Sequence, residues 1–222
     1  MGKGLALEFK LRFPDDMFEM YEKFCRQKEL SPGKLLLYKK SNPWVLNFPT
    51  KLHWNMPSKI EYIEEGLRKL SLTYRNKSIT SIAFPHLGAL SGGLDWKEVR
   101  IVMNNYLEKL DDLYIEIYNF DPNNKNIKDS LFYNLKEIIF KNNNLNFSQI
   151  EISKKKIKLL KEKIQNEEVY SMYSLQKIRG FGKKTIENFY AIAKEYRLDE
   201  ELNHSALAVS DEKTDFEVIT LF

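Results

Sequence analysis

The hydrophobic pattern of the first half of the chain predicts helices that alternate with strands. Apolar residues recur at helical spacing in three stretches, separated by short β-branched and aromatic runs that are typical of strands. The predicted helices are 17–24, 60–70 and 99–110, and the predicted strands are 35–38, 44–48, 79–84 and 114–118. Ser58 with Glu61, and Asp95 with Glu98, have the spacing of helix caps. This order favours an α/β fold.

The pattern changes after Pro122, where predicted helices are separated by Asn-rich stretches. The helix candidates are 127–141, 153–166, 171–178 and 184–196, and the Asn-rich stretches are 123–126 and 142–146. We therefore predict an α/β domain over residues 1–121, a small all-α region over 122–205 and a flexible tail over 206–222.

Composition narrows the class of protein without indicating a function. The chain has 222 residues, of which 43% are hydrophobic, as in an ordinary globular protein. No apolar run reaches the roughly 18 residues of a membrane span, and the N-terminus lacks a signal-peptide pattern. The single cysteine, Cys25, predicts a buried thiol in a reducing compartment and hence a cytoplasmic protein. His53, His86 and His204 lack ligand spacing, so neither a metal nor a cofactor is predicted.

Charge is unevenly distributed along the chain. The net charge of +4 is too small to indicate nucleic-acid binding by itself. Residues 154–184, however, hold ten basic and three acidic residues, whereas eight acidic and two basic residues follow from Glu195 onward. The basic segment is therefore the part of the chain suited to a polyanion.

A glycine-rich segment, residues 85–96, lies directly between a predicted strand and a capped helix. Its sequence is Pro-His-Leu-Gly-Ala-Leu-Ser-Gly-Gly-Leu-Asp-Trp. Glycines let backbone N–H groups approach an anion, and the helix N-terminus adds its dipole, so a diphosphate fits this position. The alternative is that Gly92-Gly93 forms only a tight turn.

Two further segments are weaker candidates for ligand binding. Met1-Gly2-Lys3-Gly4 runs into an apolar helix start, although an isolated segment of this kind is also typical of a mobile terminus. Asn47-Phe48-Pro49-Thr50-Lys51-Leu52-His53-Trp54 places a lysine just after a strand. Such a lysine is usually solvated, and it acquires a role only if it points into the same cleft as the glycine loop.

In this order and spacing, the three segments resemble the macrodomains of bacterial DarG-type antitoxins, the partners of DarT toxins that ADP-ribosylate DNA. The resemblance covers residues 1–120 and rests on Met-Gly-Lys-Gly, Asn-Phe-Pro-Thr-Lys-x-His-Trp and Leu-Gly-x-x-x-Gly-Gly-Leu-Asp-Trp. It implies a three-layer α/β/α macrodomain with a mixed sheet, short at its N-terminus. It also implies an ADP-ribose ligand and hydrolysis of ADP-ribose from DNA bases.

Carried over by position, the resemblance assigns residues of all three segments. Lys51 is implied as the catalytic lysine, either as a neutral amine that engages the anomeric carbon or as a charge that stabilises the transition state. Gly92 stands where related enzymes acting on ADP-ribosylated glutamate have aspartate, which favours DNA as substrate. The implied ADP-ribose-binding residues are Gly2, Lys3, Gly4, Thr50, His53, Trp54, Gly88, Ala89, Leu90, Ser91, Gly92, Gly93 and Leu94.

Two features depart from the family pattern. Family members have a strand, a helix and a strand before the Met-Gly-Lys-Gly loop, so we expect central strands here to lack neighbours and to expose backbone donors and acceptors. Leu90 stands where glycine is usual, and we expect it to reshape the loop. The alternative hypotheses are a non-catalytic reader of ADP-ribose or DNA, and a chain that is inactive because those strands are missing.

A second motif lies in the helical region. Residues 178–189, Ile-Arg-Gly-Phe-Gly-Lys-Lys-Thr-Ile-Glu-Asn-Phe, resemble the hairpin of a helix-hairpin-helix motif, in which glycine amides and lysines bind a DNA phosphate without reading bases. The alternative is a glycine-terminated helix followed by another helix. The implied DNA-binding residues are Gly180, Gly182, Lys183, Lys184 and Thr185. The expected partners are ADP-ribosylated, single-stranded DNA and a DarT-like toxin, with no membrane.

Overall fold

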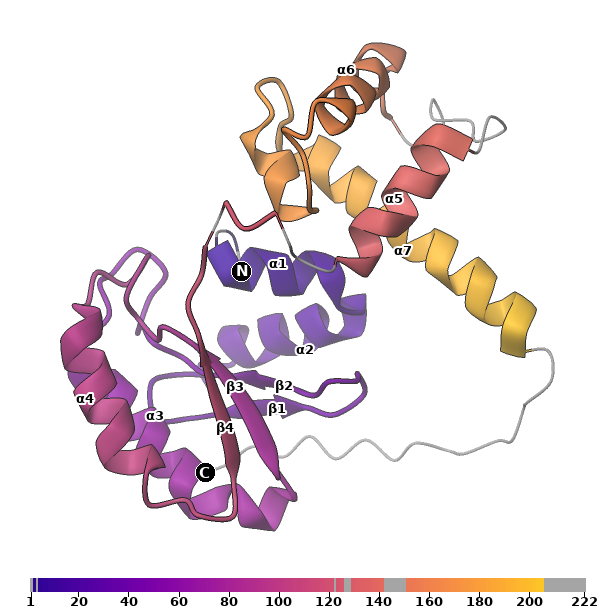
Figure 1. Cartoon of the computed structure of the whole chain (residues 1–222). Helices are drawn as coiled ribbons and strands as arrows, with labels where there is room; N and C mark the ends of the chain where they lie inside the picture. The colour runs from indigo at the N-terminus through magenta and orange to yellow at the C-terminus, as the bar shows by residue number, and fades with distance from the viewer. Residues whose placement is uncertain (1, 3, 122, 126–128, 142–150, 206–222) are drawn as a thin grey trace. The chain divides into compact units, whose positions relative to one another are not determined.

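A computed structural model describes residues 2, 4–121, 123–125, 129–141 and 151–205 (Figure 1). Its contacts divide the described chain into two compact units. One, the α/β unit, comprises Phe13–Phe120; the other, the helical unit, comprises the residues up to Arg12 together with those from Asp121 onward. One division between the units lies between Phe120 and Asp121, and the described residues up to Arg12 group with the helices rather than with the α/β part. The tail predicted over 206–222 lies outside the described residues.

The α/β unit has the predicted alternation of helices and strands. Its elements are α2 (Asp15–Arg26), β1 (Leu36–Tyr38), β2 (Val45–Asn47), α3 (Ile60–Thr73), a 3-10 turn (Arg75–Lys77), β3 (Ser81–Pro85), α4 (Trp96–Leu107) and β4 (Tyr114–Tyr118). Amphipathic spacing explains the helices, since Ile63, Leu67 and Leu70 on α3 are buried one turn apart. The predicted α/β class is confirmed. Cys25 on α2, predicted to be buried, is exposed because the buried face of that helix carries Met17 and Phe24 instead.

The strands of this unit form two separate pairs instead of the single mixed sheet that was expected. Among the described residues, β1 pairs antiparallel with β2, and β3 pairs parallel with β4. The first pair is short because Pro49 cannot donate to a ladder and Phe48 turns its ring onto α3. Gly66 leaves room for that ring, since a Cβ there would lie 2.2 Å from Phe48 Cζ.

The core of the α/β unit lies between α3, α4 and β3. Ile63, Leu67 and Leu70 from α3 cluster with Val99 and Met103 from α4, and Phe84 of β3 joins the same cluster. Helix α4 is the connection between the parallel strands β3 and β4. The turn that leaves the carboxyl end of β3 is therefore held by a packed strand on one side and a packed helix on the other. Open α/β sheets hold ligands at such ends.

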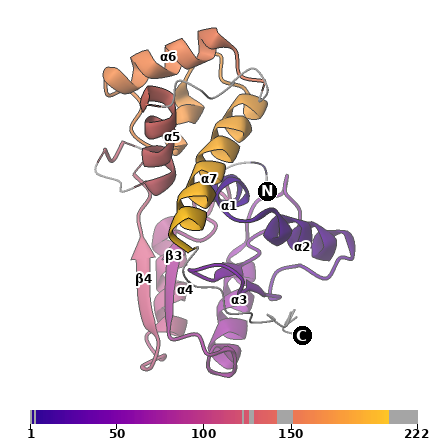
Figure 2. The same cartoon turned by 90° about the vertical axis from the view of Figure 1, so that its right-hand side faces the viewer.

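The helical unit is built from α1 (Gly4–Arg12), α5 (Ser130–Lys141), α6 (Lys154–Gln165), a 3-10 turn (Tyr173–Lys177) and α7 (Lys183–Ser205), which Figure 2 shows in a second view. Its apolar core includes Leu135 and Ile138 of α5, Leu160 of α6 and Phe189 of α7. Leu11 of α1 belongs to the same core. No helix in the described part of the chain is both long and apolar enough to cross a bilayer.

A buried polar network attaches α1 to the other helices of this unit. The carboxylate of Glu8, 8% exposed, accepts hydrogen bonds from Tyr190 Oη at 2.7 Å, Gln176 Nε2 at 2.7 Å and Arg12 Nε at 3.0 Å. The guanidinium of Arg12 also donates to both oxygens of Asp129, at 3.0 and 2.9 Å. Each carboxylate oxygen thus has a donor, as burial of charge requires.

The network also sets the charge states of its members. Burial alone would raise the pKa of Asp129, but the hydrogen bond and charge of Arg12, with the N–H groups of Met172 and Phe132, lower that pKa below its ordinary value. Burial and the carboxylate of Glu8 raise the pKa of Tyr190, so its hydroxyl stays protonated and donates.

Candidate functional site

The glycine loop between β3 and α4 is a compact turn closed by its own backbone. Leu94 N donates to Gly88 O at 3.1 Å, and Gly93 N donates to Ala89 O at 3.0 Å. Gly88 and Gly93 have φ of +66° and +80°, the left-handed region that favours glycine. Helix α4 then begins with Asp95 as its N-cap, whose Oδ1 accepts from Lys97 N at 2.9 Å, as the sequence predicted.

Three consecutive N–H groups at the tip of this loop are left without acceptors. Within the described residues, the backbone N–H groups of Leu90, Ser91 and Gly92 donate to no backbone carbonyl. Leu90 and Ser91 are exposed, with Leu90 75% exposed, whereas Gly92 is buried. A run of unpaired N–H groups beside a helix N-terminus is an arrangement that binds anions.

Gly92 is required by the packing of the loop. A Cβ at this position would lie 2.0 Å from Gly88 O and 2.3 Å from Ser58 Oγ, both far inside contact distance. Ser58 N also donates to Gly92 O at 2.9 Å. No side chain, and therefore no aspartate, fits at residue 92 in this conformation.

Lys51 lies against the same loop, although forty residues separate the two segments. Its Nζ donates to Ser91 O at 2.5 Å, and the side chain is half-buried. The proline-terminated strand β2 directs the chain toward the loop just before this lysine. The structure therefore brings together Lys51 and residues 88–94, which the sequence had singled out separately.

The neighbours of Lys51 are arranged differently. His53 Nδ1 lies 2.6 Å from Asn55 Oδ1, and the His53 ring lies 5.8 Å from the ring of Trp54. The indole of Trp54 is 82% exposed, and Thr50 is half-buried. His53 and Trp54 thus project beside the lysine and do not enclose it in this structure.

The N-terminal glycine pair belongs to the helical unit. Gly4 opens α1 with φ of +56°, and Gly2 is exposed. Lys3 lies outside the described residues. Within the α/β unit, the candidate site therefore consists of Lys51 with the glycine loop.

Three residues of the site were missed from the sequence. His86 and Trp96 stack at the two ends of the loop with ring centroids 3.6 Å apart, a contact signalled only by one aromatic ring on each side of the glycines. Ser58, predicted as a helix cap, is not one: the N-cap of α3 is Lys59, which makes no side-chain cap bond. The backbone N–H of Ser58 instead donates to Gly92 O, a contact that no local sequence pattern indicates.

The helical unit holds the second set of predicted residues. Gly180 has φ of +95°, and the turn is fixed by Phe181, whose ring stacks on Phe189 at 5.5 Å. Lys183 and Lys184 are exposed, with Glu187 and Glu151 as loose partners at 3.9 and 3.7 Å. Thr185 is buried and accepts a hydrogen bond from Lys156 Nζ at 2.6 Å, so its hydroxyl is already occupied. The element before the turn is a 3-10 turn and not the predicted α-helix.

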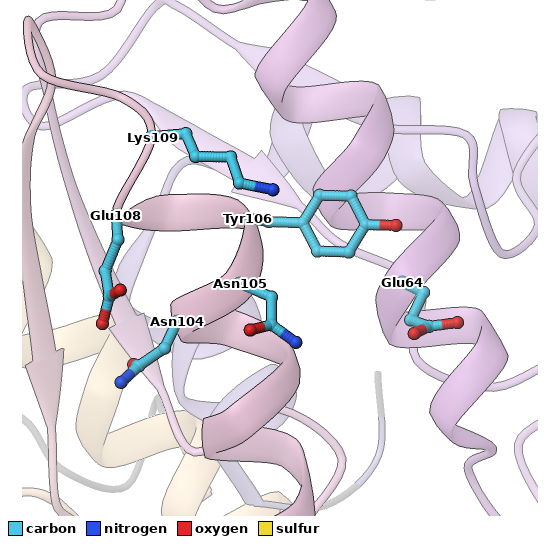
Figure 3. Close-up of a pocket in the computed structure, with 6 residues that line it drawn as sticks. All are labelled: Glu64, Asn104, Asn105, Tyr106, Glu108 and Lys109. Carbon is cyan, nitrogen blue, oxygen red and sulfur yellow. The ribbon is translucent and has the colours of Figure 1, made fainter.

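A shallow hollow of about 470 Å³ lies between α3 and α4 (Figure 3). It is lined by polar side chains, among them Glu64 of α3 and Asn105 and Tyr106 of α4, and contains none of the predicted site residues. In the described ranges, no three His, Cys, Asp or Glu side chains gather closely enough to hold a metal ion.

Comparison with known proteins connects this geometry to one family. The family model of the Macro domain matches residues 1–103. The DNA ADP-ribosyl glycohydrolase of Thermus aquaticus is 41% identical over 122 residues, which are 53% of this chain and 34% of that protein. The protein of the same name from Mycobacterium tuberculosis is 42% identical over 122 residues, again 53% of this chain and 34% of that protein. The chain thus spans about a third of the length of the curated relatives it matches.

Solved structures agree with these sequence matches. The macrodomain of Mycobacterium tuberculosis DarG superposes with a TM-score of 0.52 at 41% identity, covering 55% of this chain and 82% of that chain. Thermosipho africanus DarTG in complex with ADP-ribose gives a TM-score of 0.50 at 40% identity, covering 54% of this chain and 34% of that one. Both similarities involve about half of the present chain.

Proposed function

This chain belongs to the macrodomain family, with DarG macrodomains among its relatives, and from that premise we propose that it hydrolyses ADP-ribose from modified DNA bases. The observation that carries the proposal is the contact between Lys51 Nζ and Ser91 O, because it places an amine beside a loop with three unpaired N–H groups. The relatives from Thermus aquaticus and Mycobacterium tuberculosis are named DNA ADP-ribosyl glycohydrolases. A DNA substrate in a bacterium would place the protein in the cytoplasm.

In the proposed reaction, the diphosphate of ADP-ribose binds the N–H groups of Leu90, Ser91 and Gly92, and the dipole of α4 adds to the attraction. The bond between the base and the anomeric carbon breaks, the oxygen of water bonds to that carbon, and the proton from water goes to the base. Lys51 serves this step either as an ammonium that stabilises developing charge or as a neutral amine that bonds to the anomeric carbon as the base leaves, after which water displaces the amine from that carbon. Thr50, His53 and Trp54 would contact the riboses.

The choice of DNA as substrate is supported by Gly92. Macrodomains that act on ADP-ribosylated glutamate use an aspartate at this position, as the family resemblance implies. A Cβ at residue 92 would collide with Gly88 O and Ser58 Oγ, so this loop has no room for that carboxylate. The chemistry of the site is left to Lys51.

The test uses single-stranded DNA carrying an ADP-ribosylated base and measures released ADP-ribose. We expect the Lys51→Ala variant to lose at least about 100-fold in rate, the usual scale for one group that stabilises the transition state. Lys109→Ala, an exposed lysine after α4, is the matched control and should keep the wild-type rate.

Unchanged turnover in Lys51→Ala would remove the lysine from its role. ADP-ribose binding without release from any substrate would instead identify a non-catalytic reader.

A toxin partner is proposed from one relative. The Thermosipho africanus protein, 39% identical over 137 residues, is a fusion of a DNA ADP-ribosyl transferase with a DNA ADP-ribosyl glycohydrolase. We expect this chain to counteract a DarT-like transferase in the same way. Co-expression with such a toxin should restore growth for the wild type and not for Lys51→Ala.

The helical unit is proposed to bind DNA phosphates without reading bases. Gly180, Gly182, Lys183 and Lys184 form its contact surface, and the exposed residues Lys154, Lys155 and Lys158 of α6 add positive charge. Thr185 is left out because it is buried, at 5% exposed.

This proposal is tested by the salt dependence of DNA binding. Replacing Lys183 and Lys184 by Ala should lower the slope of log affinity against log salt by about one for each lost phosphate contact. Lys136→Ala on α5 is the control. Slopes that are equal in all three proteins would contradict the hairpin model.

A further inference from the structure

Ser58, beside the glycine loop, carries a buried hydroxyl with no assigned use. It is 5% exposed, and its hydroxyl has no hydrogen-bond partner among the residues that the structure describes. The hydroxyl does not cap α3, since the N-cap is Lys59. A buried hydroxyl without a partner destabilises the folded protein, so its presence needs a reason outside folding.

The hydroxyl faces the underside of the glycine loop. A Cβ built on Gly92 would lie 2.3 Å from Ser58 Oγ and 2.0 Å from Gly88 O, so the two oxygens flank the same point. Gly88 O accepts one hydrogen bond, from Leu94 N, and a carbonyl oxygen has room for a second. Ser58 therefore lies next to an acceptor that it does not reach in this structure.

Two hydrogen bonds tie the loop to neighbouring segments. The loop is held to neighbouring segments by Ser58 N, which donates to Gly92 O, and by Lys51 Nζ, which donates to Ser91 O. The N–H groups of Leu90, Ser91 and Gly92 have no acceptor in the described part of the chain. For Ser58 Oγ to donate to Gly88 O the loop has to shift, and an anion bound to these N–H groups would supply a cause for that shift.

We propose that Ser58 is a positioning residue that holds the glycine loop in its ADP-ribose-bound conformation by donating to Gly88 O. The inference rests on the ADP-ribose site proposed above. Because the bond forms only when the ligand is present, it stabilises the bound state and leaves the free state with an unpaired hydroxyl. The unpaired hydroxyl of Ser58 thus lowers the stability of the free protein, and the bond that it makes in the complex raises the affinity for ADP-ribose.

The test is the Ser58→Ala variant of the full chain, measured for stability and for ligand binding. Removing an unpaired hydroxyl should raise the thermal midpoint of the free protein by about 2–4 °C. Loss of the bond in the complex should weaken ADP-ribose binding about three- to tenfold, measured by calorimetry. On modified DNA the variant should show a raised KM with little change in kcat. Ser71→Ala, a serine on α3 that bonds to Arg68 O, is the control and should leave the affinity unchanged.

The opposite signs of the two effects make the outcomes decisive. A Ser58→Ala variant that is less stable than the wild type, or equally stable, overturns the inference, because its hydroxyl then has a partner in the free protein. A variant that is more stable but binds ADP-ribose equally well overturns the positioning role while leaving the proposed function intact. A wild-type protein that fails to bind ADP-ribose overturns both.

Discussion

The polar groups of the helical unit and those of the glycine loop follow opposite patterns. In the helical unit, the buried carboxylates of Glu8 and Asp129 have donors on both oxygens. In the loop, the hydroxyl of Ser58 and three backbone N–H groups have no partner in the described structure. Polar groups whose hydrogen bonds are all made stabilise a protein interior, whereas groups without a partner are available to bond to a ligand. The comparison separates a region built for stability from one built for binding.

The largest expected effect is on the helical unit. Replacing Arg12 by Met leaves Asp129, whose side chain is 2% exposed, without its charge partner. Breaking a buried ion pair from one side costs about 3–5 kcal/mol, so the free energy of unfolding should fall by that amount. Denaturant titration followed by circular dichroism measures it.

The control is Arg26→Met, because Arg26 pairs with Glu22 on the surface, with side chains 76% and 49% exposed. Such a pair contributes at most about 1 kcal/mol. If Arg12→Met lowered the free energy of unfolding no more than Arg26→Met, the polar network would not be what attaches α1. The difference drawn above between the helical unit and the glycine loop would then be wrong.

An intermediate effect is expected from adjacent glycines of the loop. Gly92→Ala forces a Cβ onto Gly88 O and Ser58 Oγ, and overpacking of this kind costs about 1–3 kcal/mol, with loss of ADP-ribose binding. Gly93→Ala meets no atom within 4 Å and carries only the strain of φ at +80°, about 1 kcal/mol.

Thermal unfolding and calorimetry compare the two glycine variants. Equal losses of affinity in both would show that backbone freedom alone, and not the close approach at residue 92, shapes the loop.

The smallest expected effect is a dependence on pH. The folded-state pKa of Asp129 lies below its ordinary value, so its contribution to stability is complete above about pH 5 and is lost as the pH falls through the folded pKa. The free energy of unfolding should therefore decline on acidification, and Asp129→Asn should flatten this decline while lowering stability at pH 7. Parallel pH profiles for wild type and variant would contradict the assignment.

Much of the site was predictable because its parts are local. The periodic apolar residues of α3 and α4, the cap at Asp95 and the glycines after β3 predicted where the glycine loop begins and ends. The two-sheet arrangement was not predictable, because a three-residue apolar run does not specify which strand it pairs with. The role of Ser58 was mispredicted, because the same residue that suits a helix cap also suits a contact with Gly92.

The sequence by itself determined the α/β class of the first part, the glycine loop and the candidate lysine, because these depend on periodicity and on backbone freedom within a few residues. Tertiary structure alone decided that Lys51 contacts Ser91, that α1 packs with the C-terminal helices and that residue 92 has no space for a side chain. The first two join segments 40 to more than 100 residues apart, whereas residue 92 is crowded both by Gly88 O within the same loop and by Ser58 Oγ from a distant segment. They arise from packing of whole elements, which no local pattern encodes.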